Sequence, residues 1–487
     1  MKAINIIANQ NNIEFVTDEL ANSNVNVTCY SPALGENVEL ARSVATLTDG
    51  KYCIDRFVNA KDLLCGRFEL VTADGKVVEG KKYVENITFS ERTFDYPVVD
   101  TKKGLQVWMI DDAIELGVKH VANNANLGNF IMPEYVEGNT IEFNYDGETY
   151  FIDKNETERM DQRVIEFTKA GMVMTLILLN SKDWGGKSVR DDFWEVIKHP
   201  DYEGKIGGRG LISQFNVITD KGVEYYKAFI AFLSERYTRD DMAYGRVVGM
   251  IVANEVNSAS VWCNSGEKTC EEFTREYAKA VRLTYQVAAS FYKNMRVYVS
   301  LDHFWTGSFS SRDYGGKYIL ENLNAEYLAE GQVPWNVAHH PYPESLAFPD
   351  FWNDKSATDD VETTKRITFK NLELLAQFLY KEEMLCDGER RRIILSEQGF
   401  NSHWTPESEI LQACAYGRAY KKIMQIPEID SFILHAHGDN KGEFGLNLGL
   451  WRRDRNEQKL VEPKPIYHVF KAIDKKDEKG VYHWERY

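Results

Sequence analysis

The sequence lacks any apolar run of about 18 residues or more, the length that a membrane-spanning helix needs. Its first residues, MKAINIIANQNNIE, contain an apolar stretch too short for the hydrophobic part of a signal peptide, and no small-residue cleavage site. We therefore expect no membrane partner. The sequence predicts a cytoplasmic protein, or a secreted or periplasmic one from which a signal peptide has been removed.

An excess of positive charge is also missing. Lys and Arg together number 58 against 74 for Asp and Glu, which gives a formal net charge of −16 at pH 7. Nucleic acids and anionic lipid surfaces are bound through clustered basic side chains. The charge therefore argues against a nucleic-acid partner, and the sequence carries no signal for an oligomeric state.

Cysteines are few and unpatterned. Their number, seven, is odd and their spacing is scattered, which is typical of neither a disulfide framework nor a zinc site. Solenoid repeats and low-complexity tracts are missing as well. What remains is an ordinary globular composition, with 43% hydrophobic and 27% charged residues. A chain of 487 residues is too long for one compact core, so two domains are expected.

Residues 1–98 carry short runs rich in β-branched and aromatic residues, such as Val25–Tyr30 and Arg67–Thr72, separated by turn residues. No long helical pattern interrupts these runs. We predict an N-terminal β domain of sandwich-like form, which either binds glycan or braces the rest of the chain.

Residues 99–487 alternate instead between apolar runs and helical patterns. Continuous apolar runs are typical of parallel strands that are buried on both faces. The expected strands cover 104–107, 120–124, 172–179, 247–254, 297–302, 333–340, 392–397 and 429–435. The expected helices cover 156–170, 223–236, 273–292, 318–329, 363–381, 410–426 and 466–472. Eight such alternating units predict a closed (β/α)₈ TIM barrel, an α/β fold whose active sites lie in the loops that follow the strands.

Two glutamates stand where such a barrel carries its chemistry. Glu255 directly follows the apolar run VVGMIVAN, and Glu397 ends the run RRIILSE. Both therefore belong at the carboxyl ends of strands, the fourth and the seventh, where a charged side chain points into the mouth of the barrel. Glycosidic bond cleavage needs such a pair of carboxyl groups, one protonated and one ionised.

The motifs around this pair occur in a defined order. Asn254–Glu255 ends the fourth strand, HPY follows the sixth with His340 and Tyr342, and SEQG ends the seventh. Gly449–Leu450 and the run KPIYHVF, which begins at Lys464, come last. This set resembles the clan A retaining glycoside hydrolases, the superfamily with catalytic glutamates after strands four and seven. It is also similar to an uncharacterised barrel family within or beside that clan, and it covers roughly residues 100–475.

The resemblance implies a function and a set of roles. Glu255 would be the acid/base and Glu397 the nucleophile in a retaining, double-displacement hydrolysis of a β-linked glycan. Tyr342 would hydrogen-bond Glu397, and Asn254 would contact the 2-hydroxyl of the sugar. The substrate would be an oligo- or polysaccharide, and neither metal nor cofactor would be needed.

The sequence departs from the clan at two positions. Asn123, Asn124 and Asn126 stand where an Arg is usual near the end of strand two, and His435 and His437 stand where a Trp is common at the end of strand eight. We expect Asn124, His340, His435 and His437 to contact the substrate. Three tryptophans in loops after strands, Trp305, Trp404 and Trp451, are expected to stack on sugar rings.

Two alternatives stay open at this point. His339, His340, His435 and His437, with Asp302 and His303, all fall near strand ends and could hold a metal in a barrel hydrolase. The first strand, GLQV, offers no ligand, which favours the glycosidase. The other alternative is a carbohydrate-binding barrel without turnover, although the sequence retains both carboxylates.

Overall fold

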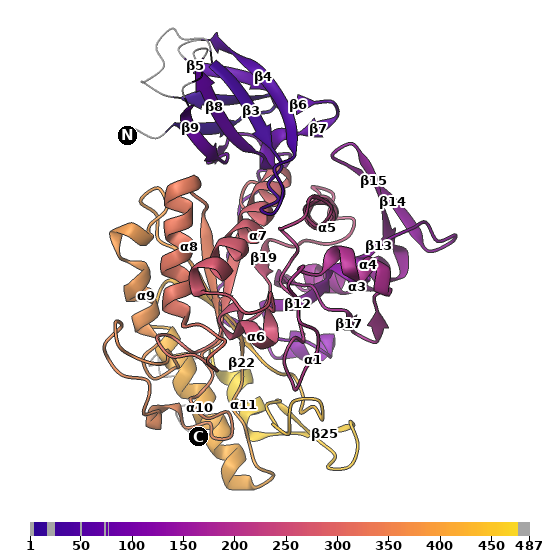
Figure 1. The fold of residues 1–487 in the computed structure, drawn as a ribbon. Coiled ribbons are helices and arrows are strands. Elements are labelled where there is room, and N and C mark those ends of the chain that lie inside the picture. The colour runs from indigo at the N-terminus through magenta and orange to yellow at the C-terminus, as the bar shows by residue number, and fades with distance from the viewer. Residues whose placement is uncertain (1–3, 17–24, 49–50, 73–74, 76, 476–487) are drawn as a thin grey trace.

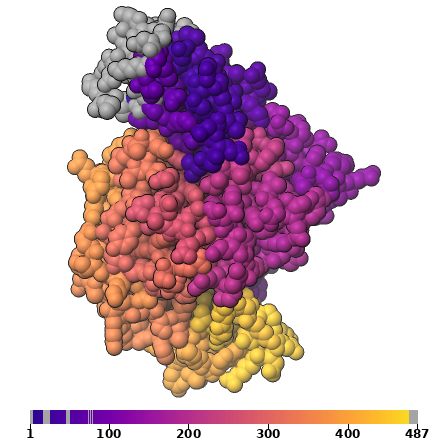
Figure 2. All heavy atoms as spheres, viewed as in Figure 1, coloured from indigo at the N-terminus to yellow at the C-terminus, as the bar shows by residue number. Residues whose placement is uncertain are grey.

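The computed structural model describes residues 4–16, 25–48, 51–72, 75 and 77–475, so the end of the predicted barrel region, 476–487, lies outside it. An N-terminal sheet lies at one end of a larger body of helices arranged around central strands (Figure 1). The space-filling view shows the atoms of the sheet seated directly on that body (Figure 2). Among the described residues, none of the helices combines the length and the apolarity that crossing a membrane requires.

The N-terminal part is one eight-stranded sheet that folds over on itself, in the order β10-β1-β2-β5-β4-β3-β8-β9. Its strands are β1 (Asn5–Ala8), β2 (Asn12–Val16), β3 (Val25–Tyr30), β4 (Glu39–Thr48), β5 (Lys51–Asp55), β8 (Arg67–Thr72), β9 (Val77–Lys82) and β10 (Asn86–Ile87), and a small hairpin, β6 (Phe57–Val58) and β7 (Lys61–Asp62), leaves it. Strand β4 pairs with β3 through residues 39–45 and with β5 through 46–48, so it passes from one half of the sheet to the other. Phe15 of β2 meets Phe68 of β8 edge-on, with ring centroids 5.5 Å apart. The two halves therefore face one another across an apolar core, as in a sandwich.

The central strands form the predicted closed barrel, in the order β11-β12-β16-β19-β20-β21-β22-β23. They are β11 (Lys103–Leu105), β12 (His120–Asn126), β16 (Val173–Leu179), β19 (Gly249–Val252), β20 (Arg296–Leu301), β21 (Trp335–His339), β22 (Ile393–Gln398) and β23 (Ile429–Leu434). Each strand pairs in parallel with its neighbours, and β23 closes the ring on β11. Ile177, Ile251, Tyr298, Ile394 and Ile433 belong to one buried cluster that these strands share. Each expected strand overlaps an observed one, because a strand buried on both faces needs the continuous apolar run that made it recognisable.

The helices follow the strands along the chain. They are α1 (Ile110–Glu115), α2 (Leu127–Phe130), α3 (Lys154–Lys169), α4 (Asp191–Ile197), α5 (Asp220–Tyr237), α6 (Ala259–Trp262), α7 (Cys270–Phe291), α8 (Gly316–Glu330), α9 (Glu373–Leu379), α10 (Pro406–Ile423) and α11 (Pro465–Ala472). Local sequence explains where the longest of them begins. Thr269 and Glu272 form a capping box at the start of α7, which satisfies backbone N–H groups that have no partner within the helix.

The helix expected over 363–381 is wrong in its first half, because only Glu373–Leu379 is helical. Side chains upstream bind the backbone instead. The Asn371 amide donates to the carbonyls of Thr358 and Arg366, and the Thr364 hydroxyl bonds Ser356 and Arg366. Thr and Asn side chains compete with helical hydrogen bonds in this way, so the segment folds as part of the long loop after β21.

Three further loops after barrel strands carry small sheets. They contain β13 (Ile131–Met132) with β14 (Thr140–Tyr145) and β15 (Glu148–Asp153), then β17 (Asp183–Trp184) with β18 (Lys187–Ser188), and finally β24 (Trp451–Arg453) with β25 (Leu460–Pro463). These insertions account for the length of the barrel region and thicken the face on which the strands end.

Backbone hydrogen bonds join the N-terminal sheet to the barrel helices. The Tyr83 N–H donates to the Glu330 carbonyl at the end of α8, and the Gln286 amide on α7 donates to the Val84 carbonyl. The Leu34 N–H donates to the Val217 carbonyl just before α5. The sheet thus packs against the α5–α7–α8 side of the barrel.

A buried ion pair holds the last two loops of the barrel together. Lys464, from the KPIYHVF run, and Asp439 are 0% and 1% exposed, and their charged atoms lie 2.8 Å apart. The same ammonium group donates to the hydroxyl of Ser402 in the loop after β22. A buried pair stabilises little by itself, but removal of one partner leaves an uncompensated charge.

We therefore expect Lys464→Met to lower the free energy of unfolding by about 3–5 kcal/mol in urea denaturation. The double variant Lys464→Met/Asp439→Asn should recover much of this loss, because no charge stays buried. Lys471→Met, which removes an exposed partner of Glu115, is the matched control and should cost at most about 1 kcal/mol. Equal losses in both Lys variants would contradict this account.

Candidate active site

Glu255 stands on an unusual backbone at the end of the fourth barrel strand. Ala253 and Glu255 have φ angles of 62° and 38°, in the left-handed region that residues other than Gly rarely adopt. The Glu255 N–H donates to the Ser300 hydroxyl of β20 at 2.9 Å, and the short turn Val256–Ser258 follows at once. Strain of this kind persists only where the surrounding structure enforces it, and it is typical of functional positions.

Glu397 lies on the seventh barrel strand at an irregularity in its pairing. Leu395 pairs with Phe432 and Gln398 with Leu434, so β22 holds one residue more than β23 between these points. Such a bulge turns a side chain away from its regular direction. Glu397 is half-buried there, and the Tyr342 hydroxyl donates to its Oε1 at 3.2 Å. The expected contact between Tyr342 and Glu397 is thus present.

The two glutamates meet across the mouth of the barrel. An oxygen of Glu255, an oxygen of Glu397 and a nitrogen of His340 all lie within 4.8 Å of one another. The Glu255 side chain is 14% exposed, so its carboxylate is half-buried but open to the cleft. Two like charges this close repel one another, so donors must compensate them.

His340 is the main compensating group on the side of Glu255. Its Nδ1 lies 2.9 Å from Glu255 Oε1 and its Nε2 lies 2.9 Å from the Ser396 hydroxyl. Burial lowers the pKa of His340, but the hydrogen bond to Glu255 and the charge of Glu397 outweigh it, so the net pKa is raised. The ring is 1% exposed and bonded to Glu255 and Ser396, which favours a positioning role for His340. Its expected contact with the substrate stays a prediction.

Tyr342 and Asp302 complete the surroundings of the pair. Burial and then the charge of Glu397 raise the pKa of the Tyr342 phenol. The phenol therefore stays protonated and can donate its hydrogen bond to Glu397. Asp302 is buried at the end of β20, where it accepts from the side chains of Asn257 and Ser258 in the turn after Glu255. Burial, followed by the charge of Glu255, raises the pKa of Asp302 to about 7. Asp302 thus braces the turn that carries Glu255.

The asparagines expected in the site are placed to contact a ligand. Asn254 is half-buried beside Glu255, and Asn124 is exposed near the end of β12. Asn126, by contrast, is buried and bonds Asn129 and Ser181 within the protein. Substrate contacts by Asn254 and Asn124 stay predictions.

His437 and Trp305, both expected to contact the substrate, are buried among protein groups. His437 is 0% exposed: its Nδ1 accepts from the Trp108 N–H and its Nε2 donates to Asp112. Trp305 is 1% exposed, its indole N–H donates to the Val361 carbonyl, and its ring packs edge-on against Phe378 of α9. No ring face is left for a sugar, because the long loop after β21 covers Trp305.

The other two tryptophans remain partly exposed. Trp404 lines a surface pocket of about 410 Å³ whose walls include neither catalytic candidate, and the guanidinium groups of Arg453 and Arg455 lie 5.0 and 5.2 Å from its ring. Trp451 donates its indole N–H to Asp112 and packs edge-on against Tyr467. Stacking of either ring on a sugar stays a prediction.

Sequence reasoning missed two residues that contact His435 at the end of the eighth strand. Gln106 Oε1 lies 2.6 Å from His435 Nδ1, and Glu443 Oε2 lies 3.1 Å from His435 Nε2. Gln106 could have been found from the sequence, because it is a polar residue at the end of the first strand. Glu443 could not, because it lies within a loop whose path depends on tertiary packing. His435 is thus held between two acceptors.

The histidines expected as metal ligands are already engaged by protein groups. Both nitrogens of His340 are bonded as described, and those of His303 lie against the Tyr342 carbonyl and Arg366. His339 Nε2 lies 3.0 Å from the Ile367 carbonyl. These bonds favour an acid–base site over a metal site at the mouth of the barrel.

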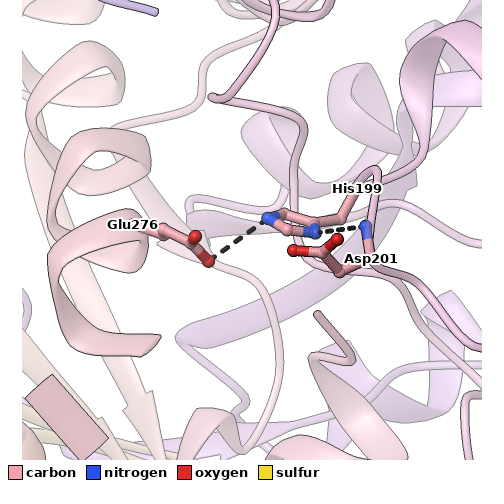
Figure 3. A group of neighbouring side chains, drawn as sticks. All are labelled: His199, Asp201 and Glu276. Atoms are coloured by element: carbon pink, nitrogen blue, oxygen red, sulfur yellow. Dashed lines mark hydrogen bonds and ion pairs between the residues drawn. The ribbon is translucent and has the colours of Figure 1, made fainter. Parts of the chain in front are cut away.

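A second group with metal-ligand spacing joins the loop after β16, which carries His199 and Asp201, to Glu276 on α7. Figure 3 shows the His199 ring between Asp201 and Glu276, with Nδ1 accepting from the Asp201 N–H and Nε2 lying 3.2 Å from Glu276. Lys268 pairs with Asp201 at 2.7 Å and with Glu276 at 3.1 Å. The Lys268 ammonium group already supplies the positive charge that a metal would bring. These ion pairs therefore link the loop of Asp201 to the helix of Glu276.

The fold and the paired glutamates define a (β/α)₈ barrel protein with a two-carboxylate site at the carboxyl ends of its strands. By sequence, residues 95–484 match the family described as "Family of unknown function (DUF5722)", and the chain belongs to that family. No curated protein matches the chain.

Solved structures similar to the chain include several glycosidases. A family 39 glycoside hydrolase from Bacteroides cellulosilyticus WH2 is 14% identical, with 97% of this chain and 82% of that chain covered and a TM-score of 0.48. A β-glucosidase from Pyrococcus furiosus is 15% identical, with coverage of 74% and 82% and a TM-score of 0.47. A β-glucuronidase from Bifidobacterium dentium is 13% identical, with coverage of 97% and 63% and a TM-score of 0.40. At such identities a likeness bears on the fold alone.

The buried histidines around the site make stability depend on pH. Burial lowers the pKa of His339 to about 3. The unfolded chain, with an ordinary pKa of about 6.5, binds more protons than the folded one between these values. Stability from this group is therefore complete above about pH 6.5 and is lost as the pH falls.

We expect His339→Gln to flatten this dependence. Between pH 6.5 and 4.5 the wild type should lose about 2–3 kcal/mol more free energy of unfolding than the variant, as measured by urea denaturation. His468→Gln, at an exposed position of α11, is the control. Parallel pH curves for wild type and His339→Gln would contradict the assignment.

Proposed function

We propose that the protein is a retaining glycoside hydrolase that acts on β-linked glycans, with Glu397 as nucleophile and Glu255 as acid/base. The observation that carries the proposal is the approach of the two carboxylates to within 4.8 Å. Retaining enzymes hold their carboxyl groups about 5–5.5 Å apart, whereas inverting enzymes leave about 6.5–9.5 Å for a water molecule. The separation supports direct attack by a carboxylate.

In the first step Glu397 attacks the anomeric carbon. The bond to the leaving oxygen breaks as Glu255 transfers its proton to that oxygen, and a glycosyl ester of Glu397 forms. His340 holds Oε1 of Glu255, which leaves Oε2 for the proton transfer. Tyr342 keeps its hydrogen bond to Glu397 and orients the attacking carboxylate.

In the second step the ionised Glu255 takes a proton from water. The water attacks the anomeric carbon from the face that the leaving group vacated, and Glu397 departs as a carboxylate. Two inversions restore the original configuration. Asn254, beside Glu255, would bond the 2-hydroxyl of the sugar in both steps.

We assign catalysis to the barrel region, 99–487, and a bracing role to residues 1–98. The hydrogen bonds from Tyr83, Val84 and Leu34 to the barrel helices support this division.

Glu255→Gln and Glu397→Gln should fail in different ways. With an activated aryl β-glycoside, whose leaving group needs no proton, Glu255→Gln should still form the glycosyl-enzyme and then turn over about 10²–10⁴-fold more slowly. Mass spectrometry should find the intermediate on Glu397, and azide, which needs no general base, should restore turnover. Glu397→Gln should form no intermediate at all.

The exposed Glu407→Gln, on the helix after the nucleophile strand, is the matched control and should behave as wild type. If both active-site variants lose stability alike and neither forms an intermediate, the two glutamates are structural.

The wild type should release a product of unchanged configuration. Early NMR spectra of a β-glycoside digest should show the β-anomer before mutarotation. Early appearance of the α-anomer would mean that a water, and not Glu397, attacks the sugar.

A further inference from the structure

A polar chain of side chains borders the catalytic pair at the end of the eighth strand. Gln106, His435 and Glu443 come from the two ends of the barrel sequence and meet where β23 closes on β11. The mechanism above uses none of them. Their chemistry bears on which sugar the site can hold.

Both nitrogens of His435 lie against side-chain oxygens. Nδ1 faces the carbonyl oxygen of Gln106 and Nε2 faces a carboxylate oxygen of Glu443, and both partners are acceptors. Burial lowers the pKa of His435, but the hydrogen bond to Glu443 and the charges of Glu397 and Glu443 outweigh it and raise the net pKa. The imidazolium is therefore committed to Glu443 and Gln106.

Glu443 keeps acceptor capacity that the protein does not use. A carboxylate offers about four lone-pair positions. His435 takes one on Oε2, and the Asn440 amide takes one on Oε1 at 3.2 Å. The side chain is 24% exposed, so the remaining positions can accept hydrogen bonds from a ligand.

Glu443 lies near the catalytic pair through its partner His435. The His435 N–H donates to the carbonyl of Gln398, the residue that follows Glu397 on the neighbouring strand, and the His435 ring contacts Glu443. The charge of Glu443 also acts on Tyr342, together with those of Glu397 and Glu255. Glu443 is thus a third carboxylate beside the two catalytic candidates. In the described structure, Glu255 contacts the imidazole ring of His340 and Glu443 contacts that of His435.

Binding of an acidic sugar would be favoured by an arginine at the site. Arg366, in the long loop after β21, is already bound to other protein groups. Its guanidinium group stacks on Phe304 at 4.4 Å and donates to His303 and to the Ser356 hydroxyl. A sugar carboxylate or sulfate at this position would lie against the carboxylate of Glu443. The two negative groups would repel one another, and neither could donate a hydrogen bond.

We propose, on the basis of the proposed function, that Glu443 determines specificity, and that the sugar attacked by Glu397 is an uncharged one that donates hydroxyl groups to Glu443. His435 and Gln106 hold that carboxylate in place. Uronic acids and sulfated sugars are excluded from this position.

The test compares three aryl β-glycosides with one leaving group: a neutral hexoside, a glucuronide and a glucosaminide. For the wild type, kcat/KM on the best neutral hexoside should exceed that on the glucuronide at least about 100-fold. Glu443→Gln removes the charge and keeps one acceptor, so it should lower kcat/KM on the neutral hexoside about 10–100-fold. The ratio of kcat/KM on the neutral hexoside to that on the glucuronide should therefore fall. Glu457→Gln, at an exposed position between β24 and β25, is the matched control.

Each result decides the inference. A preference for the glucuronide or for the glucosaminide overturns it, as does a ratio that Glu443→Gln leaves unchanged. If the wild type cleaves none of the three and an activated fluoro-sugar fails to label Glu397, the proposed function fails. The recognition is then tested alone, by saturation-transfer NMR with methyl β-glycosides. Binding of a neutral glycoside that Glu443→Gln weakens supports it, and no binding or preferential binding of the uronide overturns it.

Discussion

Two carboxylates held within 4.8 Å of one another are the constraint around which the site is built. Left to themselves, flexible side chains would separate such charges. The closed barrel prevents this, because Glu255 and Glu397 extend from two strands whose positions are fixed by their neighbours around the ring. The left-handed backbone at Glu255 and the bulge at Glu397 then direct the two side chains toward each other.

Hydrogen-bond donors offset the negative charge that the two glutamates bring together. His340, fully buried, fixes one oxygen of Glu255, and Tyr342, half-buried, fixes one oxygen of Glu397. Each contacts only Oε1 of its partner. Glu443 extends the same arrangement outward: His435 and Asn440 hold it while part of its carboxylate stays exposed. An acidic cavity follows, and its donors are side chains of the barrel wall.

The parts outside the mouth stabilise this geometry without entering it. The N-terminal part is hydrogen-bonded to the last residue of α8, to Gln286 on α7 and to the loop before α5, and the buried Lys464–Asp439 pair joins the loops that follow β22 and β23. The long loop after β21 covers Trp305, which packs in the core beside α9, while Tyr342 stays half-buried against Glu397.

The sequence by itself determined the barrel and the position of the catalytic candidates. Parallel strands buried on both faces require continuous apolar runs, and a carboxylate at the end of such a run has nowhere to point but the barrel mouth. It likewise predicted that Tyr342 meets Glu397. Tertiary structure alone decided which polar residues near strand ends face the cleft. His437 follows the eighth strand as His435 does, yet it is fully buried against Asp112, and the loop after β21 buries Trp305. Gln106 meets His435 only because β23 closes on β11, and contacts between chain segments this far apart leave no periodic pattern in the sequence.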